Sequence, residues 1–412
     1  MTALTPLERS VLLLIAVLAA LAGVANYQAW PAVPRFAVAT LALAGLAWVV
    51  SFATEQLGER FGPGITGMLQ STLGNLPELF VVIFALQKGE LVVAQTAIIG
   101  SILANALLVL GLVVVVGARR SSDGLMRFSK RLPNDTATLL QVTVFIIVLL
   151  GLSLASHDPA SHHVKTISAV GAVCLLVVYL TWVVPYLRSD QVPGSGEPLG
   201  REGDAQTPMP EAGPAELSNP EAGHAELSMP EAGHAELSES AAGDREAPKP
   251  EAADAAVRGP RLSLRLTLAL LLIAGTASAF VSDWFVNGLE PAITQLHISQ
   301  AFAGLVIVAI AGNAVENTAG LVLAFKGHAD LAISVVKNSV AQIAAFLFPL
   351  IVLVSFLLAT TLTFALAPVY IGALALTALV LWQVTGDGEA AEFEGWALVA
   401  LYVILATLTL YE

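Results

Sequence analysis

Long apolar segments recur along most of the chain, and shorter polar stretches separate them. Each segment is long enough for an α-helix to cross the hydrocarbon core of a bilayer, which takes about 17–25 residues. We therefore expect an all-α polytopic membrane protein. The predicted spans, eleven in all, are 8–25, 35–54, 65–86, 91–116, 137–155, 165–187, 264–284, 299–324, 330–357, 364–384 and 394–410.

The composition agrees with this pattern. The chain is 56% hydrophobic and 12% charged, whereas ordinary soluble domains carry about 25% charged residues. The net charge of −13 comes mainly from one loop and indicates no nucleic-acid partner. Cys174 is the only cysteine, which excludes an intrachain disulfide and a thiolate metal cluster. The first span lacks the features of a cleaved signal peptide, so we expect it to remain as a helix.

Lys and Arg are distributed unequally between the two sides of the predicted topology. If the N-terminus and every second loop share one side, that side holds 15 basic residues and the other holds 3. Without the long central loop the ratio is still 8 to 3. The positive-inside rule then places the N-terminus in the cytoplasm, and the Ala/Leu-rich composition favours a bacterial plasma membrane.

Residues 188–261 differ from the apolar sequence around them. They include 15 acidic and 6 basic residues and three tandem ten-residue units, which begin at Pro210, Pro220 and Pro230. The regular Pro and Gly residues interrupt any helix, so the composition favours a solvated, disordered cytoplasmic linker. A second interpretation is an acidic segment that concentrates divalent cations near a cytoplasmic entrance.

Two short motifs, Gly74-Asn75-Leu76-Pro77-Glu78 and Gly312-Asn313-Ala314-Val315-Glu316, stand 238 residues apart. The constant offset indicates an internal duplication, with five spans in each repeat. Because five is odd, the repeats cross the membrane in opposite directions, and such inverted repeats place substrate near the midplane where they meet. The expected parts are an extra N-terminal helix at 1–34, a first repeat at 35–187, the acidic linker at 188–261 and a second repeat at 262–412.

The motifs place Glu78 and Glu316 near the middle of apolar spans. A carboxylate at the bilayer centre costs at least about 3 kcal/mol, so its presence favours a functional site over a structural carboxylate paired with a nearby cation. Two carboxylates match the charge of a divalent cation. When the cation leaves, the carboxylates repel each other, which favours their protonation and predicts exchange of a divalent cation for protons.

Neutral oxygen ligands accompany each carboxylate. Asn75 and Asn313 stand three residues earlier, on the same helical face. Gly74 and Pro77 are expected to weaken the helix locally, and Pro77 to free a backbone carbonyl in the turn before it. Carboxylate, amide and carbonyl oxygens suit Ca²⁺, and suit Mg²⁺ and Mn²⁺ less well. The motif residues of this predicted metal site are Gly74, Asn75, Glu78, Gly312, Asn313 and Glu316.

The following span of each half adds polar side chains, namely Ser101, Asn105, Ser339 and Gln342. They could serve only as interhelical hydrogen-bonding groups, but the neighbouring glutamates favour a role as cation ligands or as supports for them. Lys337 lies within the same apolar sequence. Its ammonium could snorkel to the cytoplasmic surface or pair with a site glutamate when the ion is absent.

These motifs resemble those of the cation/proton exchangers of the calcium/cation antiporter superfamily, over about 45 residues in each half. The resemblance implies Ca²⁺ extrusion or sequestration driven by a proton gradient, with Glu78 and Glu316 as the central carboxylates. Many members have His directly after the second glutamate, where this chain has Asn317, and Gly before the serine, where it has Asn338 after Lys337. The other shared residues are Lys88, Gly89, Gly100, Ser101, Ile102, Leu103, Asn105, Phe325, Lys326, Gly327, Asp330, Leu331, Ser339, Gln342 and Ile343.

The sequence therefore predicts a secondary active transporter, not an enzyme, that exchanges Ca²⁺ or another divalent cation for protons by alternating access. Ca²⁺ is the transported substrate, and no permanently bound cofactor is expected. Protons and the lipid bilayer are the other partners, and a homo-oligomer is left open. The alternatives are a Na⁺-driven Ca²⁺ exchanger of the same superfamily, a cation channel and, least favoured, a non-transporting membrane sensor.

Overall fold

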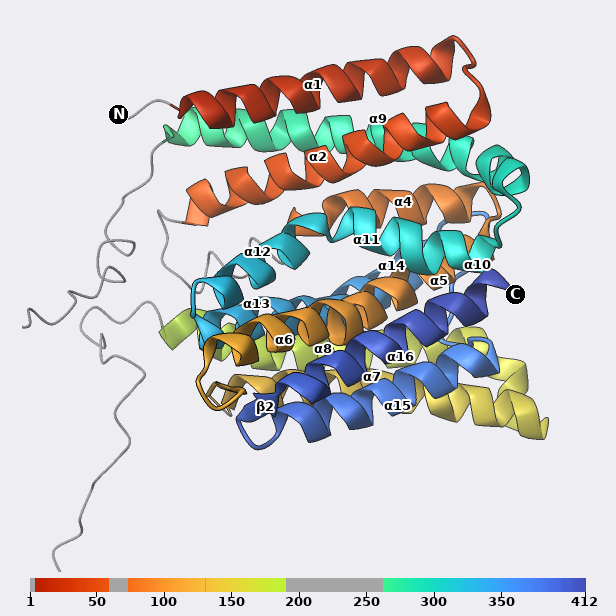
Figure 1. Ribbon diagram of the computed structural model, residues 1–412. Helices are drawn as coiled ribbons and strands as arrows, with labels where there is room; N and C mark the ends of the chain where they lie inside the picture. Colours follow the sequence, from red (N-terminus) through yellow and green to blue (C-terminus); the bar gives the residue numbers. More distant parts are fainter. Residues whose placement is uncertain (1–3, 59–72, 130, 190–261) are drawn as a thin grey trace, which may run out of the picture. The chain divides into compact units, whose positions relative to one another are not determined.

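The computed structural model describes residues 4–58, 73–129, 131–189 and 262–412, with the backbone alone at 131–134, 185–189 and 315–316 (Figure 1). The predicted linker therefore lies almost entirely outside the described residues. The same holds for the first part of the predicted span 65–86.

Helices make up nearly all of the described first half. They are α1 (Pro6–Tyr27), α2 (Ala32–Gly58), α4 (Leu76–Gln87), α5 (Leu91–Leu103), the π-helical turn η1 (Ala104–Val109), α6 (Leu110–Arg120), α7 (Arg131–Ser156), the 3₁₀ helix η2 (Pro159–His163) and α8 (Val164–Ser189).

The described second half contains α9 (Leu264–Leu296), α10 (Gln300–Phe302), the π-helical turn η4 (Ala303–Val308), α11 (Ala309–Gly312), α12 (Ala314–Phe325), α13 (Ala329–Gln342), the π-helical turn η5 (Ile343–Leu347), α14 (Phe348–Ser355), α15 (Pro368–Thr385) and α16 (Glu392–Leu410). Strand β1 (Leu125–Arg127) pairs antiparallel with β2 (Glu389–Ala391) and so ties the two halves together.

Membrane-spanning helices dominate the fold, as the apolar pattern predicts. Within the described ranges, nine helices are long and apolar enough to cross a membrane, and the count is ten if a helix pair bent by 58° between Gly312 and Asn317 is one span. The predicted span 65–86 is described only from residue 73, so its full length stays a prediction. The all-α membrane fold is confirmed.

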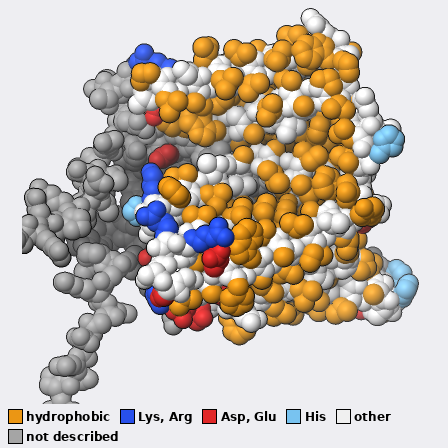
Figure 2. All heavy atoms as spheres, in the orientation of Figure 1, with side chains coloured by type: hydrophobic (Ala, Val, Ile, Leu, Met, Phe, Trp, Pro, Cys, Tyr) orange, Lys and Arg blue, Asp and Glu red, His pale blue; other side chains and the backbone are white. Residues whose placement is uncertain are grey.

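Large apolar side chains remain on the outside of these helices. Leu14 of α1, Phe145 of α7 and Leu272 of α9 are all more than half exposed. Figure 2 shows apolar side chains across the middle of the face in view, with Lys and Arg gathered toward one end. Such an apolar surface would promote aggregation in water, but it matches a lipid environment.

The duplication predicted from the 238-residue offset is visible in the backbone. Helices α4 and α12 occupy matching positions, and the turns that follow them each contain a glycine with positive φ, +83° at Gly89 and +85° at Gly327. Helices α5 and α13 come next in each half, and each leads into a π-helical turn, η1 or η5. The two halves therefore fold as equivalent units.

Small residues allow the halves to pack closely. A Cβ atom added at Gly100 of α5 would stand only 2.4 Å from the backbone oxygen of Leu305 in η4. A Cβ atom at Gly304 would stand 2.0 Å from Oγ1 of Thr96. Glycines at a helix crossing let backbones approach in this way, which is how membrane helices commonly associate.

Several boundaries differ from the sequence prediction by a few residues or more, and two of them have a visible cause in the packing. Helix α9 has 33 residues and continues to Leu296, because buried apolar residues such as Phe285, Leu289 and Ile293 extend its packing face beyond residue 284. Helix α15 begins at Pro368 rather than at residue 364, since Leu362 and Phe364 lie buried in non-helical chain before it. Neither difference changes the number of spans.

Substituting Gly100 by Ala should destabilise the protein, because overpacking of a tight helix crossing costs about 1–3 kcal/mol. The matched control is Gly372→Ala in α15, where nothing lies within 4 Å of an added Cβ atom. Thermal denaturation of the detergent-solubilised protein, followed by tryptophan fluorescence, should show a lower midpoint for Gly100→Ala only. Equal midpoints for the two variants would contradict the close crossing of the halves.

Candidate functional site

Each Gly-Asn motif interrupts its membrane span. Helix α11 ends at Gly312, and Asn313 precedes α12 with φ −104° and ψ 17°. In the first half, Asn75 precedes α4 with φ −87° and ψ 8°. Among the described residues, the backbone therefore leaves the regular helix at the asparagine of both motifs, and transporters often place substrate sites where helices end in this way.

The break changes how the predicted ligands are arranged. Asn75 and Asn313 stand directly before the first turn of a second helix, at its N-cap position. Glu78 and Glu316 are each the third residue of that second helix. The N-terminal end of a helix carries partial positive charge and free N–H groups, which stabilise a nearby carboxylate.

Pro77 lies at the start of α4, directly after the break at Asn75. It occupies the first turn of α4, where its missing N–H would have had no intrahelical partner. The second half breaks at the same place with Val315 instead of proline. The Gly-Asn pair, and not the proline, is therefore the feature common to both breaks.

Glu78 of the first motif packs beside the backbone at Gly312 of the second motif. Glu78 is buried, with 1% of its surface exposed. A Cβ atom added at Gly312 would stand 3.7 Å from Cβ of Glu78. The structure therefore brings the two motifs together, as the inverted repeat predicts, although the side chain of Glu316 lies outside the described residues.

Four of the predicted polar residues form one buried network across the halves. Asn105 Nδ2 donates to Oδ1 of Asn313 at 3.2 Å and to Oγ of Ser339 at 3.3 Å. Asn313 Nδ2 in turn donates to Oγ of Ser101 at 2.9 Å. Because Ser101 and Asn105 belong to the first half and Asn313 and Ser339 to the second, these bonds connect the repeats directly.

The remaining predicted ligands differ in their placement. Gly74 and Asn75 are buried at the break before α4. Gln342 is only half-buried at the last position of α13 and makes no hydrogen bond with any described residue of the network. The prediction that Gln342 lines the site therefore has no support from the described contacts.

Lys337 does not snorkel to the surface. The side chain is 1% exposed, and Nζ donates a hydrogen bond to Oγ1 of Thr385 in α15. The snorkelling alternative is wrong because the buried hydroxyl of Thr385 holds the ammonium inside the helix bundle. Pairing of Lys337 with a site glutamate stays a prediction.

Helix α9 contributes two serines that the sequence motifs did not indicate. Ser282 Oγ donates to the carbonyl oxygen of Pro77 at 3.4 Å, which is a backbone oxygen in the first turn of α4. Ser278 lies one turn earlier on the same face of α9, and its buried Oγ has no hydrogen-bond partner among the described residues. The feature of the sequence that could have indicated these serines is their i, i+4 spacing within an apolar span.

The Lys88-Gly89 turn joins α4 and α5 and is held to α9. Lys88 Nζ lies 3.1 Å from a carboxylate oxygen of Asp283 and also contacts Oδ1 of Asn287. The pKa of neighbouring Glu90 is raised from its ordinary value, first by partial burial and then by the negative charge of Glu290, while Lys88 opposes the shift. This turn thus fixes the far end of the half-helix that carries Glu78.

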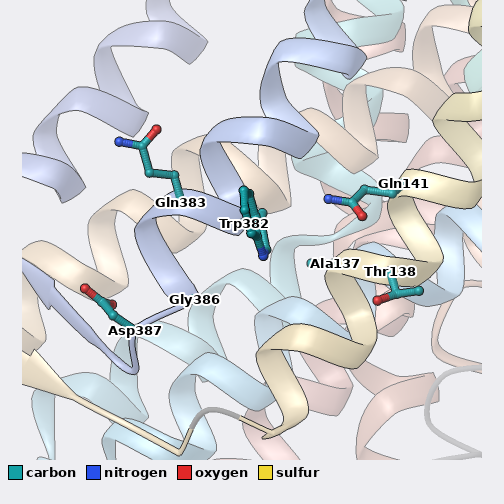
Figure 3. A pocket seen from close by; sticks show the side chains of 7 residues that line it. All are labelled: Ala137, Thr138, Gln141, Trp382, Gln383, Gly386 and Asp387. Carbon is teal, nitrogen blue, oxygen red and sulfur yellow. The ribbon is translucent and has the colours of Figure 1, made fainter.

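A separate pocket lies between α7 and α15. Its volume is about 400 Å³, and Figure 3 shows Thr138 and Gln141 on one helix and Trp382 facing them from the other. The pocket contains none of the predicted ligands, so it is not the cation site. Its lining residues are Ala137, Thr138, Gln141, Trp382, Gln383, Gly386 and Asp387.

Comparison with known proteins places this chain in a family. Residues 32–186 and 266–411 match the sodium/calcium exchanger protein family, which covers more than half of the chain. The chain belongs to that family. The two matched segments correspond to the two helical halves, and the unmatched stretch between them contains the acidic linker.

Individual relatives make the likeness more specific. The chain is similar to the Ca(2+)/H(+) antiporter ChaA of Bacillus subtilis, with 26% identity over 97% of this chain and 98% of the relative. It is 27% identical to a vacuolar calcium ion transporter of Schizosaccharomyces pombe, over 94% of this chain and 82% of the relative. The resemblance to the cation/proton exchangers is thereby confirmed.

A solved structure agrees with the fold. The structure of native YfkE superposes with a TM-score of 0.70 and 22% sequence identity, covering 98% of this chain and all of that one. The overall fold therefore belongs to one already known from experiment.

The cross-half network should appear as energetic coupling in a double-mutant cycle. Asn105→Ala and Ser339→Ala should be non-additive in the free energy of unfolding, because both remove the same hydrogen bond. Cycles on membrane helices give about 0.6 kcal/mol on average and up to about 1.7. As a control, Asn105→Ala with Thr54→Val should be additive, since Oγ1 of Thr54 bonds only within α2.

The cycle is measured by reversible unfolding in mixed micelles. A coupling near zero for Asn105 and Ser339 would contradict the network.

Proposed function

We propose that this chain is a secondary transporter that exchanges Ca²⁺ for protons by alternating access. The observation that carries the proposal is the burial of Glu78 at the start of one half-helix, against the Gly-Asn break of the other. Membrane transporters bind ions at such broken helices near the midplane. Relatives named as a Ca(2+)/H(+) antiporter and a vacuolar calcium ion transporter support the choice of ion.

The chemistry follows from the groups in and beside the two breaks. Two carboxylates, from Glu78 and Glu316, balance the charge of one Ca²⁺ ion, and amide and backbone oxygens complete a hard-ligand set. Without the ion, two carboxylates facing each other away from water are unfavourable, and binding protons removes that charge. Ca²⁺ and protons therefore compete for the same groups, which makes exchange obligatory.

The inverted arrangement provides a route for alternating access. The two motif helices belong to halves that cross the membrane in opposite directions, so one broken span can open the site to each side in turn. The side rich in Lys and Arg is the cytoplasmic one by the positive-inside rule. On that basis the N-terminus is cytoplasmic.

Sodium-driven exchange is the second candidate, since it occurs within the same superfamily. Sodium-driven exchange would be expected to need more than two acidic ligands, placed around several adjoining ion positions. Of the acidic side chains that the structure describes, Glu78 alone is buried, and with Glu316 that gives two for the site. This count favours protons over Na⁺ as the coupling ion.

Replacing either central carboxylate should abolish exchange. Glu78→Gln and Glu316→Gln each keep the side-chain shape but remove the charge and the titratable oxygen, so neither ion can be bound properly. The assay is ⁴⁵Ca²⁺ uptake by proteoliposomes with an imposed pH gradient. The control is Glu290→Gln, which changes an exposed residue of α9. Normal uptake by either central variant would remove that glutamate from the site.

The same proteoliposomes distinguish the coupling ion. A pH gradient should drive uptake in the absence of Na⁺, whereas a Na⁺ gradient at equal pH should not. Uptake that follows only the Na⁺ gradient would establish the sodium-driven alternative.

Deleting residues 205–243 should leave transport largely intact. These residues contain the tandem repeats and an excess of acidic side chains, so their loss removes charge that concentrates cations but no predicted ligand. We expect a modest rise in the Ca²⁺ concentration for half-maximal uptake and little change in maximal rate. A deletion variant that inserts normally but does not transport would overturn the interpretation of this stretch as a spacer.

A further inference from the structure

The pocket between α7 and α15 contains none of the predicted cation ligands, and it is built from both halves of the protein. Ala137, Thr138 and Gln141 line it from α7, whereas Trp382 and Gln383 line it from α15. Its volume of about 400 Å³ lies within the range that small-molecule sites usually have. The pocket is therefore large enough to hold a compact polar group between the halves.

The pocket lies at the end of two membrane spans, where lipid headgroups meet water. These spans run from Asp135 to Ser156 and from Pro368 to Thr385. Gln141 and Trp382 belong to the spans, but Asp387 stands beyond the end of the second one. The pocket therefore extends from the polar surface of the bilayer toward its apolar interior.

Hydrogen-bond donors line the part of the pocket that lies within the spans. Figure 3 shows the indole of Trp382 opposite Thr138 and Gln141 of α7. Trp382 is 57% exposed, and Gln141 is exposed as well, so their N–H groups are accessible to a ligand. An indole N–H can only donate, and amide and hydroxyl groups can donate too. Such a set suits an anionic oxygen, and a phosphate group presents several.

A carboxylate lines the pocket on its water side. Asp387 belongs to the chain that follows α15. Its Oδ1 accepts a hydrogen bond from the backbone N–H of Glu389 at 3.2 Å. No Lys, Arg or His within the described ranges lies at ion-pairing distance from Asp387. Its negative charge is therefore available to an ammonium group in the pocket.

A buried cation lies on the inner side of the end of α15. Lys337 Nζ donates to Oγ1 of Thr385, a buried residue that does not line the pocket. Thr385 stands three residues after Trp382, so this positive charge lies about one helical turn from the indole. It favours an anionic group beside Trp382 and an ammonium farther out, beside Asp387.

The surface next to the pocket, toward the membrane interior, suits acyl chains. Phe145 is one turn beyond Gln141 on α7 and is 63% exposed. Leu379 is about one turn before Trp382 on α15 and is 56% exposed. From water inward, the order is thus a carboxylate, a set of donors and an apolar surface. The ammonium, the phosphate and the acyl chains of a zwitterionic phospholipid follow one another in the same order.

We propose that this pocket binds the headgroup of phosphatidylethanolamine and so joins α7 to α15 across the two halves. The phosphate accepts hydrogen bonds from Trp382, Gln141 and Thr138, and the ammonium donates to Asp387. Phosphatidylglycerol has no ammonium and leaves the carboxylate unpaired. The ammonium of phosphatidylcholine has no N–H to donate. The pocket therefore prefers phosphatidylethanolamine to both.

The test alters the groups that bind the two ends of the headgroup. Asp387→Asn removes the negative charge, and Trp382→Phe removes the indole N–H but keeps an aromatic ring. The matched controls are Glu290→Gln in α9 and Trp396→Phe in α16, because neither residue lines the pocket. Native mass spectrometry of the full chain in detergent, titrated with phosphatidylethanolamine, phosphatidylcholine or phosphatidylglycerol, counts the lipids that stay bound.

We expect both pocket variants to bind phosphatidylethanolamine about two- to tenfold more weakly than the controls do, as the loss of one hydrogen bond predicts. Asp387→Asn should also lose the preference for phosphatidylethanolamine over phosphatidylglycerol, whereas Trp382→Phe should weaken the binding of both lipids. A merely structural role would leave the lipid preference unchanged. Equal binding of the two lipids by the unaltered protein, or variants that match the controls, would overturn the proposal.

Other occupants of the pocket give different results in the same experiment. If soluble phosphoethanolamine at equal concentration displaces the lipid, the ligand is a free zwitterion and the lipid proposal fails. If the protein forms a dimer that added lipid does not dissociate and that Asp387→Asn abolishes, a second copy of the chain covers this surface, and the proposal fails as well. Lipid binding to the monomer that phosphoethanolamine does not displace supports the proposal.

Discussion

Burying a carboxylate away from water is unfavourable. The arrangement of the helices around Glu78 reduces this cost. Glu78 is almost fully buried at the start of α4, an apolar helix of 12 residues. Its surroundings include the start of α4, with the partial positive charge of a helix N-terminus, and the backbone at Gly312 in the other half. A continuous helix would have offered neither, because its N–H groups would be engaged along the span.

The broken spans require the halves to be held in register, and the buried amide network does this. Asn105 bridges Asn313 and Ser339 across the repeats, while Gly100 lets α5 approach η4 closely. Hydrogen bonds between membrane helices are individually weak, so such contacts can rearrange when the site changes its occupancy. A rigid hydrophobic interface at this place would resist the movement that alternating access requires.

The sequence was sufficient to predict the described spans, the duplication and the buried carboxylate of Glu78. This is because a bilayer restricts both the length of a spanning helix and the polar residues within it. The sequence indicated a weakened helix near Glu78 but not the matching break at Asn313, because the proline of the first motif has no counterpart in the second. Residues of α9 such as Ser282 were missed because their role depends on packing between distant segments. Lys337 was ambiguous for the same reason: its hydroxyl partner lies on a helix far away in the sequence.

Proton release on Ca²⁺ binding tests the central claim most directly, because it reports the competition between the two ions without requiring transport. Purified protein in weakly buffered detergent solution is titrated with Ca²⁺ while a pH indicator follows released protons. If Ca²⁺ and protons share Glu78 and Glu316, each Ca²⁺ bound should release protons, more of them at lower starting pH, as for other sites whose ligands must be deprotonated. Saturable Ca²⁺ binding that releases no protons at any starting pH would contradict the account.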